Sequence, residues 1–168
     1  MAFRSRRRAF LAILLAATLA TAGCGRGPKV PGVAALGPND VILAFGDSLT
    51  YGTGASEAES YPAVLAELTG RKVIRSGVPG EVTEGGLARI AEVLETHRPA
   101  LVIVCLGGND MLRKLDDATT KANLREIIKT IKAAGISVVL VGVPKPAFIT
   151  DAAPFYAEIA GEFGIPYE

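Results

Sequence analysis

The stretch Val41-Ile42-Leu43-Ala44-Phe45-Gly46-Asp47-Ser48-Leu49-Thr50-Tyr51-Gly52 decides how the fold is interpreted. It opens with five apolar residues and then changes to Gly-Asp-Ser, a pattern typical of a buried β-strand that ends in a turn. In an α/β fold this places Ser48 at the carboxyl edge of the sheet, where such folds bind ligands. Gly46 has no Cβ and therefore lets the backbone turn sharply. Taken alone, Asp47 and Ser48 also fit an ordinary turn or helix cap.

The composition indicates one globular domain rather than a disordered or disulfide-rich chain. Of the 168 residues, 49% are hydrophobic and 21% are charged, which is enough for one sizeable core. The net charge is +1 and the sequence shows no basic face beyond its N-terminal arginines, so we expect no nucleic-acid partner. We also expect no cofactor or metal. If Cys24 is modified, Cys105 has no partner and fits a buried apolar position.

Residues 1–24 are predicted to be an export signal. Four arginines precede an uncharged run from Ala9 to Ala22, whose fourteen residues fall short of the ~20 that a membrane-spanning helix needs. The run ends in Thr21-Ala22-Gly23-Cys24, which resembles the lipobox of bacterial lipoproteins; an ordinary secretory signal is the alternative. Arg7-Arg8 also resembles a twin-arginine signal. We therefore expect an exported protein of the cell envelope, in the periplasm or at the outer membrane or cell surface, anchored in a membrane through lipidated Cys24.

Residues 25–40 are rich in Gly and Pro and are predicted to tether the domain of residues 41–168. Within that domain, apolar runs alternate with segments of helical periodicity. The expected strands are 41–45, 72–75, 100–106, 136–143 and the start of a fifth at 165–167. The expected helices are 60–70, 83–97, one that contains 124–131 and ends at Gly135, and one that starts at Asp151 and Pro154 and ends at Gly164. This alternation predicts a flavodoxin-like, doubly wound parallel sheet in a three-layer α/β/α arrangement, truncated after the fourth strand and its helix.

Three loops that follow strands bring distinctive groups to one edge of the predicted sheet. They are Gly46-Asp47-Ser48, Gly80 in a Pro-Gly-Glu turn, and Gly107-Gly108-Asn109-Asp110. Acyl transfer at a serine needs a nucleophile and hydrogen-bond donors for the developing oxyanion. Ser48 fits the nucleophile, while the backbone N–H groups of Ser48 and Gly80 and the side-chain amide of Asn109 fit the donors. Each loop also fits a turn or a cap, but their shared edge favours a site.

These blocks resemble the first three sequence blocks of the GDSL/SGNH hydrolase family, from about residue 40 to the C-terminus. Through Tyr61-Pro62 and Gly85-Gly86-Leu87-Ala88-Arg89 the sequence is most similar to the secreted arylesterase, acyl thioesterase and lysophospholipase branch. The resemblance implies that Ser48 is the nucleophile, that Ser48 N–H, Gly80 N–H and the Asn109 side chain form the oxyanion hole, and that Asp47 supports them. It also implies an ester, thioester or lysophospholipid substrate and a loop from Pro144 to Asp151 that borders the acyl pocket.

One family block is missing from the sequence: the Asp-x-x-His that supplies the general base and its orienting carboxylate. The only histidine, His97, ends a predicted helix that leads into the third strand. It should lie at the opposite sheet edge, about 20 Å from Ser48, whereas a general base must lie within ~3 Å. Asp116, Asp117 and Asp151 are expected to be helix caps. Because the sequence ends inside an expected strand, we expect a chain cut short, with little or no esterase activity and a poorly covered fourth strand.

Other interpretations stay open. A non-catalytic binding domain would keep the oxyanion pocket without the base, and a carbohydrate deacetylase would belong to the same family. A flavodoxin-type or receiver-type domain would use Ser, Thr and Gly after the first strand to bind phosphate. The sequence offers that third interpretation neither an aromatic pair around a flavin nor an acidic cluster around a phosphoacceptor Asp.

Overall fold

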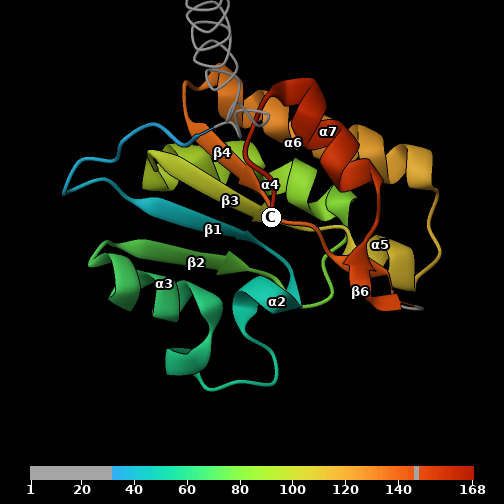
Figure 1. Ribbon diagram of the computed structural model, residues 1–168, viewed down its shortest axis with the longest axis horizontal. Helices are drawn as coiled ribbons and strands as arrows, with labels where there is room; N and C mark the ends of the chain where they lie inside the picture. Colours follow the sequence, from blue (N-terminus) through green and yellow to red (C-terminus); the bar gives the residue numbers. More distant parts are fainter. Residues whose placement is uncertain (1–31, 146–147) are drawn as a thin grey trace, which may run out of the picture. The chain divides into compact units, whose positions relative to one another are not determined.

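The computed structural model describes residues 32–145 and 148–168, which contain one parallel four-stranded sheet (Figure 1). The strands lie in the order β2-β1-β3-β4 and are β1 (Ile42–Gly46), β2 (Val73–Gly77), β3 (Leu101–Cys105) and β4 (Ser137–Leu140). Gly46 lies opposite both Gly77 and Cys105, so the first three strands end at the same level of the sheet. The predicted doubly wound parallel topology is therefore confirmed, with the strand that precedes Ser48 at its centre.

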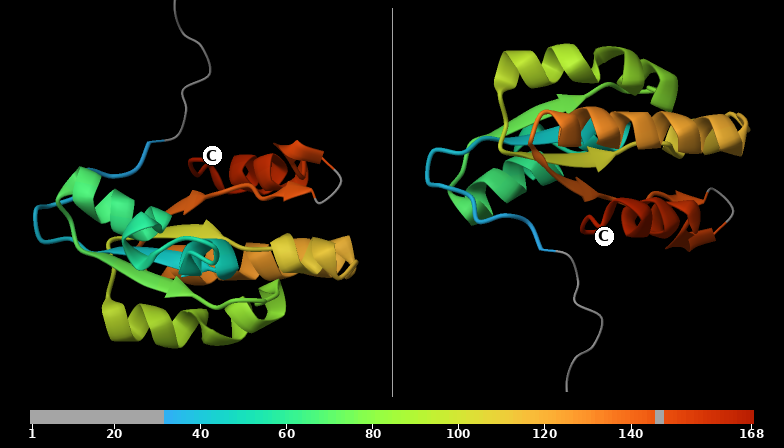
Figure 2. Two further views of the ribbon diagram at one scale, coloured as in Figure 1. Left: turned by 90° about the horizontal axis from the view of Figure 1, so that it is seen from below. Right: turned by 90° about the horizontal axis from the view of Figure 1, so that it is seen from above.

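Helices cover both sides of this sheet, as the three-layer prediction requires. They are α2 (Ser48–Tyr51), the 3-10 helix η1 (Glu57–Glu59), α3 (Tyr61–Thr69), α4 (Thr83–His97), α5 (Gly108–Leu112), α6 (Asp117–Ala133) and α7 (Phe155–Phe163). Figure 2 shows α3 and α4 on opposite sides of the strands. The helix α6 packs beside α4, and α7 contacts α6.

The long helices end where the sequence has residues that terminate helices. The helix α4 spans the predicted residues 83–97, and Gly70 and Gly164 end α3 and α7 in the left-handed backbone conformation that glycine favours. Two predicted element boundaries were wrong at the C-terminal side. Asp151 does not start a helix but lies in β6, and the fourth strand ends at Leu140 instead of extending to residue 143.

An antiparallel pair of short strands, β5 (Pro144–Lys145) and β6 (Phe148–Ala152), replaces the loop expected after β4. The segment between Val143 and Asp151 carries no clear alternation of apolar and polar residues, so its pairing had no signal in the sequence. The hairpin comes directly after β4 in the chain, at the carboxyl edge of the sheet where the three strand-end loops also lie. Its first residue, Pro144, contributes to a cavity at that edge.

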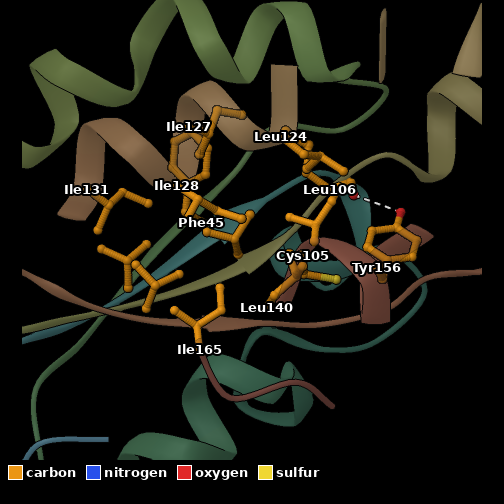
Figure 3. Close-up of a cluster of buried hydrophobic side chains, with 14 of the residues drawn as sticks. Phe45, Cys105, Leu106, Leu124, Ile127, Ile128, Ile131, Leu140, Tyr156 and Ile165 are labelled. Atoms are coloured by element: carbon orange, nitrogen blue, oxygen red, sulfur yellow. Dashed lines mark hydrogen bonds between the residues drawn. The ribbon is translucent and has the colours of Figure 1, made fainter. Parts of the chain in front are cut away.

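The hydrophobic core lies between the sheet and the apolar face of α6 (Figure 3). Phe45 of β1 and the helix residues Ile127 and Ile128 are fully buried there. Cys105 is also buried, as predicted, and burial raises the pKa of its thiol to about 12. The hydroxyl of Tyr156 reaches into the same core and donates a 2.9 Å hydrogen bond to the carbonyl oxygen of Leu106. Buried and with a raised thiol pKa, Cys105 packs in this core as a small apolar residue.

The outer edge of β4 is covered by the last residues of the chain. Tyr167 forms a parallel bridge with Leu140. The backbone N–H of Leu140 donates to Pro166, and the N–H of Gly142 donates to Glu168 at 2.7 Å. The expected start of a fifth strand is thus present as a single bridge, and the expectation of a poorly covered fourth strand is wrong over these residues.

No helix in the described ranges 32–145 and 148–168 is long and apolar enough to cross a membrane. The predicted export signal of residues 1–24, its lipobox and Cys24 lie outside the described residues, as does the first part of the predicted tether. Residues 32–40, which make up the rest of that tether, contain neither helix nor strand.

Candidate active site

The turn that carries Ser48 is the first part of the site. Ser48 is the first residue of α2 and is half-buried, and Asp47 is the N-cap of that helix. The Asp47 carboxylate accepts a 3.0 Å hydrogen bond from the backbone N–H of Leu49, which satisfies one of the free N–H groups at a helix start. The sequence pattern placed Ser48 directly after the strand, and the structure adds that it opens a helix.

Glycine is needed at the ends of β1 and β2 because α2 and the end of β3 lie tightly against them. A Cβ at Gly46 would overlap the carbonyl oxygen of Cys105. A Cβ at Gly77 would lie only 2.6 Å from the carbonyl oxygen of Asp47. The φ of Gly46 is not positive. Its missing Cβ instead makes room for the close approach of Cys105 and Thr50.

The side chain of Asn109 connects the second and third loops to this turn. Asn109 lies in α5, and its Nδ2 donates to Asp47 Oδ2 at 3.2 Å and to the carbonyl oxygen of Glu81 at 2.9 Å. The opposite amide orientation would set the Asn109 oxygen against two other acceptors, so these bonds fix the direction of the amide. Asn109 thus holds together the turn after β1 and the loop after β2.

Gly80 lies beside these groups in the loop after β2. Its φ of +78° is in the left-handed region, where glycine carries no steric penalty. The guanidinium of Arg113 donates a 2.6 Å hydrogen bond to its carbonyl oxygen. Within the described part of the chain, the N–H groups of Gly80 and Ser48 donate no hydrogen bond, so both are free to bind an anion.

A cavity of about 180 Å³ lies at this sheet edge. Its lining residues are Asp47, Ser48, Leu49, Gly108, Asn109, Leu112, Val143 and Pro144. The structure therefore brings Ser48, Asp47 and Asn109 together around one cavity, whereas Gly80 is not among its lining residues and is joined to them through Glu81 and Asn109. Leu49 and Leu112 are 52% and 64% exposed and form an apolar rim.

Asp47 is the titratable residue directly before Ser48, and both line the same cavity. Its removal from water raises the pKa of its carboxyl group, and the negative charges of Glu81 and Asp110 raise it further. The hydrogen bond from Leu49 opposes this shift. The carboxyl group is thus held by hydrogen bonds rather than by a cation.

A helix cap was the alternative interpretation of the Asn109-Asp110 pair, and Asp110 does cap a helix, though not its own. Its buried carboxylate accepts from the backbone N–H of Thr83 at 3.0 Å and from the Thr83 hydroxyl at 2.6 Å. Thr83 begins α4, whose N-cap residue, Val82, makes no side-chain capping bond. Asp116 caps α6 as predicted, and Asp117 lies in the first turn of that helix.

His97 lies away from the site, as predicted. It is the last residue of α4, which leads to the start of β3, and that end of β3 pairs with Ile42 at the start of β1. Ser48 follows the other end of β1. A larger hollow of about 470 Å³ opens near His97 between α4 and α6, lined in part by Leu94 and Arg98, and it contains none of the predicted site residues.

Glu81 and Arg89 form a nearly buried ion pair behind the site, and no role for either was predicted from the sequence. The sequence did contain a hint for Arg89. It comes three residues after Gly86, on the buried face of α4, and a buried cation needs a partner of opposite charge. The described residues hold no cluster of three or more His, Cys, Asp or Glu side chains that could bind a metal.

The fold and site define a class: doubly wound α/β proteins with a serine and an amide side chain around a pocket at the carboxyl edge of the sheet. Within that class, the chain belongs to the GDSL-like lipase/acylhydrolase family, whose model matches residues 44–166.

Individual relatives agree with this assignment. The chain is 34% identical over 134 residues to thioesterase 1/protease 1/lysophospholipase L1 of Escherichia coli K12, covering 76% of this chain and 64% of that protein. It is 34% identical over 113 residues to the arylesterase of Vibrio mimicus, covering 64% and 56% of the two chains. The crystal structure of AlinE4, an SGNH-hydrolase family esterase, matches with a TM-score of 0.70 and 36% identity over 79% of this chain and 77% of that one. The chain thus spans 64% or less of these two curated relatives.

Proposed function

We propose that this chain carries the nucleophile and the oxyanion-binding groups of a serine acyl hydrolase that acts on carboxylic esters or thioesters. The observation that carries the proposal is the placement of the Ser48 and Asn109 side chains on one cavity. The names of the relatives, which include a thioesterase, a lysophospholipase and an arylesterase, support the substrate class.

In the first step, the Ser48 hydroxyl oxygen attacks the carbonyl carbon of the substrate and the carbonyl oxygen becomes an oxyanion. The N–H groups of Ser48 and Gly80 and the Asn109 amide donate to this oxyanion. Asn109 would give up its longer bond, the 3.2 Å one to Asp47 Oδ2. The leaving alcohol or thiol takes a proton, an acyl ester remains on Ser48, and water then hydrolyses it.

None of these residues supplies the general base that would take the proton from Ser48. The sequence has one histidine, His97, and it lies at the other sheet edge. Solvent bases must then remove the Ser48 proton, and loss of a triad histidine lowers kcat by several orders of magnitude. We therefore expect the 168-residue polypeptide to be a slow esterase.

The apolar rim supports a substrate with an acyl or aryl group. Leu49, Leu112 and Val143 lie around Ser48, and an apolar group placed against them would leave water. Export to the cell envelope with a lipid anchor on Cys24 would place the site near lysophospholipids. Cys24 lies outside the described residues, so the anchor rests on the sequence pattern alone.

Chemical rescue tests the proposal. Hydrolysis of a p-nitrophenyl ester is measured with and without imidazole, for the unaltered chain and for Ser48→Ala, which corrects for the hydrolysis that imidazole catalyses in solution. We expect slow turnover that rises with imidazole only when Ser48 is present. Fast turnover without imidazole that Ser48→Ala abolishes would contradict the missing base.

The second candidate is a non-catalytic binding domain, which the distance of His97 from Ser48 favours. Its signature would be binding of an ester or its carboxylic acid product with no Ser48-dependent hydrolysis at any imidazole concentration. That outcome would contradict the hydrolase proposal for this chain.

A further inference from the structure

The guanidinium of Arg89, on α4, lies behind the candidate site and is held on several sides. Its Nε and Nη2 donate to the two carboxylate oxygens of Glu81 at 2.7 and 2.6 Å. The two side chains are only 20% and 7% exposed. A bidentate pair of this kind fixes the direction as well as the distance of both groups, because the fork of arginine matches the two oxygens.

The same guanidinium contacts the ends of both neighbouring strands. Its Nη1 donates to the Ser76 hydroxyl at 2.7 Å, and its Nη2 donates to the carbonyl oxygens of Ser76 at 3.1 Å and Gly46 at 3.2 Å. The plane lies over the ring of Phe45, with the guanidinium carbon 4.0 Å from the ring centroid, a favourable cation–π contact. One side chain therefore links β1, β2 and the Glu81 loop.

Each segment that Arg89 holds leads to one of the proposed oxyanion donors. Gly46 comes two residues before Ser48, and Glu81 directly follows Gly80. The carbonyl oxygen of Glu81 accepts the 2.9 Å hydrogen bond that orients the Asn109 amide. The positions of all three donors relative to one another thus depend on the strands and the loop that this guanidinium joins.

We propose that Arg89 is a positioning residue that sets the geometry of the oxyanion hole through Glu81 and Gly46. The proposal rests on the proposed function of Ser48. Arg89 acts through other residues and contacts no substrate. Displacement of a donor by about 1 Å can lower a rate 100-fold, so a loosened loop would weaken the chemistry without removing any group from the cavity.

A purely structural role has to be separated from positioning. Removing Arg89 alone leaves the Glu81 carboxylate buried without its cation, which destabilises a fold by itself. Replacing both partners by uncharged residues of similar size removes that penalty. The double variant Arg89→Met with Glu81→Gln should therefore recover the melting temperature but not the donor geometry.

The test measures the melting temperature and the rate at which a fluorophosphonate labels Ser48 in imidazole buffer. We expect Arg89→Met to lower both, with labelling about 100-fold slower, and the double variant to regain the melting temperature while labelling stays slow. Arg89→Lys should label at an intermediate rate, because lysine keeps the charge but not the planar fork. The matched control is Arg125→Met, which breaks the 2.7 Å ion pair with Glu162 between α6 and α7 and should label at the unaltered rate.

Recovery of the labelling rate together with the melting temperature in the double variant would overturn the proposal, as would an unchanged rate in Arg89→Met. If the unaltered chain is not labelled at Ser48, the proposed function fails, and hydrogen exchange of residues 78–82 decides the role of Arg89. Faster exchange in the stable double variant than in Arg125→Met supports the proposal, and equal exchange contradicts it.

Discussion

Asp47 shows how a single residue serves both the fold and the site. Its carboxylate caps α2 through Leu49 and accepts a hydrogen bond from Asn109. Burial raises its carboxyl pKa above the ordinary value of 3.8. The folded chain is therefore less stable when the Asp47 carboxyl group is ionised than when it is protonated.

This raised pKa predicts how stability depends on pH. A carboxyl group whose pKa is higher in the folded state binds its proton more tightly there. Its stabilising contribution is complete below 3.8 and is lost as the pH rises through the folded-state pKa. Asp47→Asn removes the titration. We expect the free energy of unfolding of the variant, relative to the unaltered chain, to improve as the pH rises from 3.8 toward neutrality.

Urea denaturation of both proteins at several pH values measures this difference, in which the carboxyl groups other than the neighbouring Glu81 and Asp110 cancel because both chains contain them. A difference that stays constant over the range, or that moves against Asp47→Asn as the pH rises, would contradict the raised pKa.

At this scale the sequence predicted where Ser48 lies but not what surrounds it. The strand pattern alone places Ser48 after β1. The bonds from Asn109 to Asp47 and Glu81 join residues that are 62 and 28 positions apart. Such contacts depend on how three loops meet, which no local pattern encodes.

At the scale of elements, α4 depends on a cap supplied by another helix. Asp110 of α5 accepts two hydrogen bonds from Thr83 and one from Thr120 of α6 at 3.3 Å. The helix α6 instead uses the residue next to it, Asp116, which accepts from the backbone N–H of Thr119 at 2.8 Å. One cap is thus buried and tertiary, and the other is local and exposed.

The two caps predict different losses of stability. Asp110→Ala leaves the buried N–H and hydroxyl of Thr83 without their acceptor, which should lower the free energy of unfolding by about 2–4 kcal/mol. Asp116→Ala exposes its helix N–H groups to water and should cost clearly less. Urea denaturation of the two variants makes the comparison, and equal losses would contradict the tertiary cap.

Helices that end at a glycine or before a proline were predictable from the sequence, and the hairpin was not. The bounds of α4 follow from its apolar spacing and from Pro99, while α3 and α7 end at glycines. The strands β5 and β6 pair with each other outside the main sheet, so neither needs the buried apolar run that marks a central strand.

At the scale of the whole molecule, the family assignment and the site support each other. Residues 44–166 match the family model, and that range contains the loops of Ser48, Gly80 and Asn109. The chain covers 64% of its Escherichia coli relative. Within its 168 residues, the single histidine lies at the wrong edge of the sheet for proton transfer.

We propose that the fold presents Ser48 as a nucleophile. The direct measurement is mass-spectrometric mapping of the adduct that a fluorophosphonate forms with the folded chain in imidazole buffer. Ser48→Ala tests the site, and Ser56→Ala, at the exposed cap of η1, is the matched control. We predict an adduct on Ser48 alone, which Ser56→Ala leaves intact and Ser48→Ala abolishes. Labelling that persists in Ser48→Ala, or that never exceeds that of the unfolded chain, would contradict a nucleophilic role of Ser48.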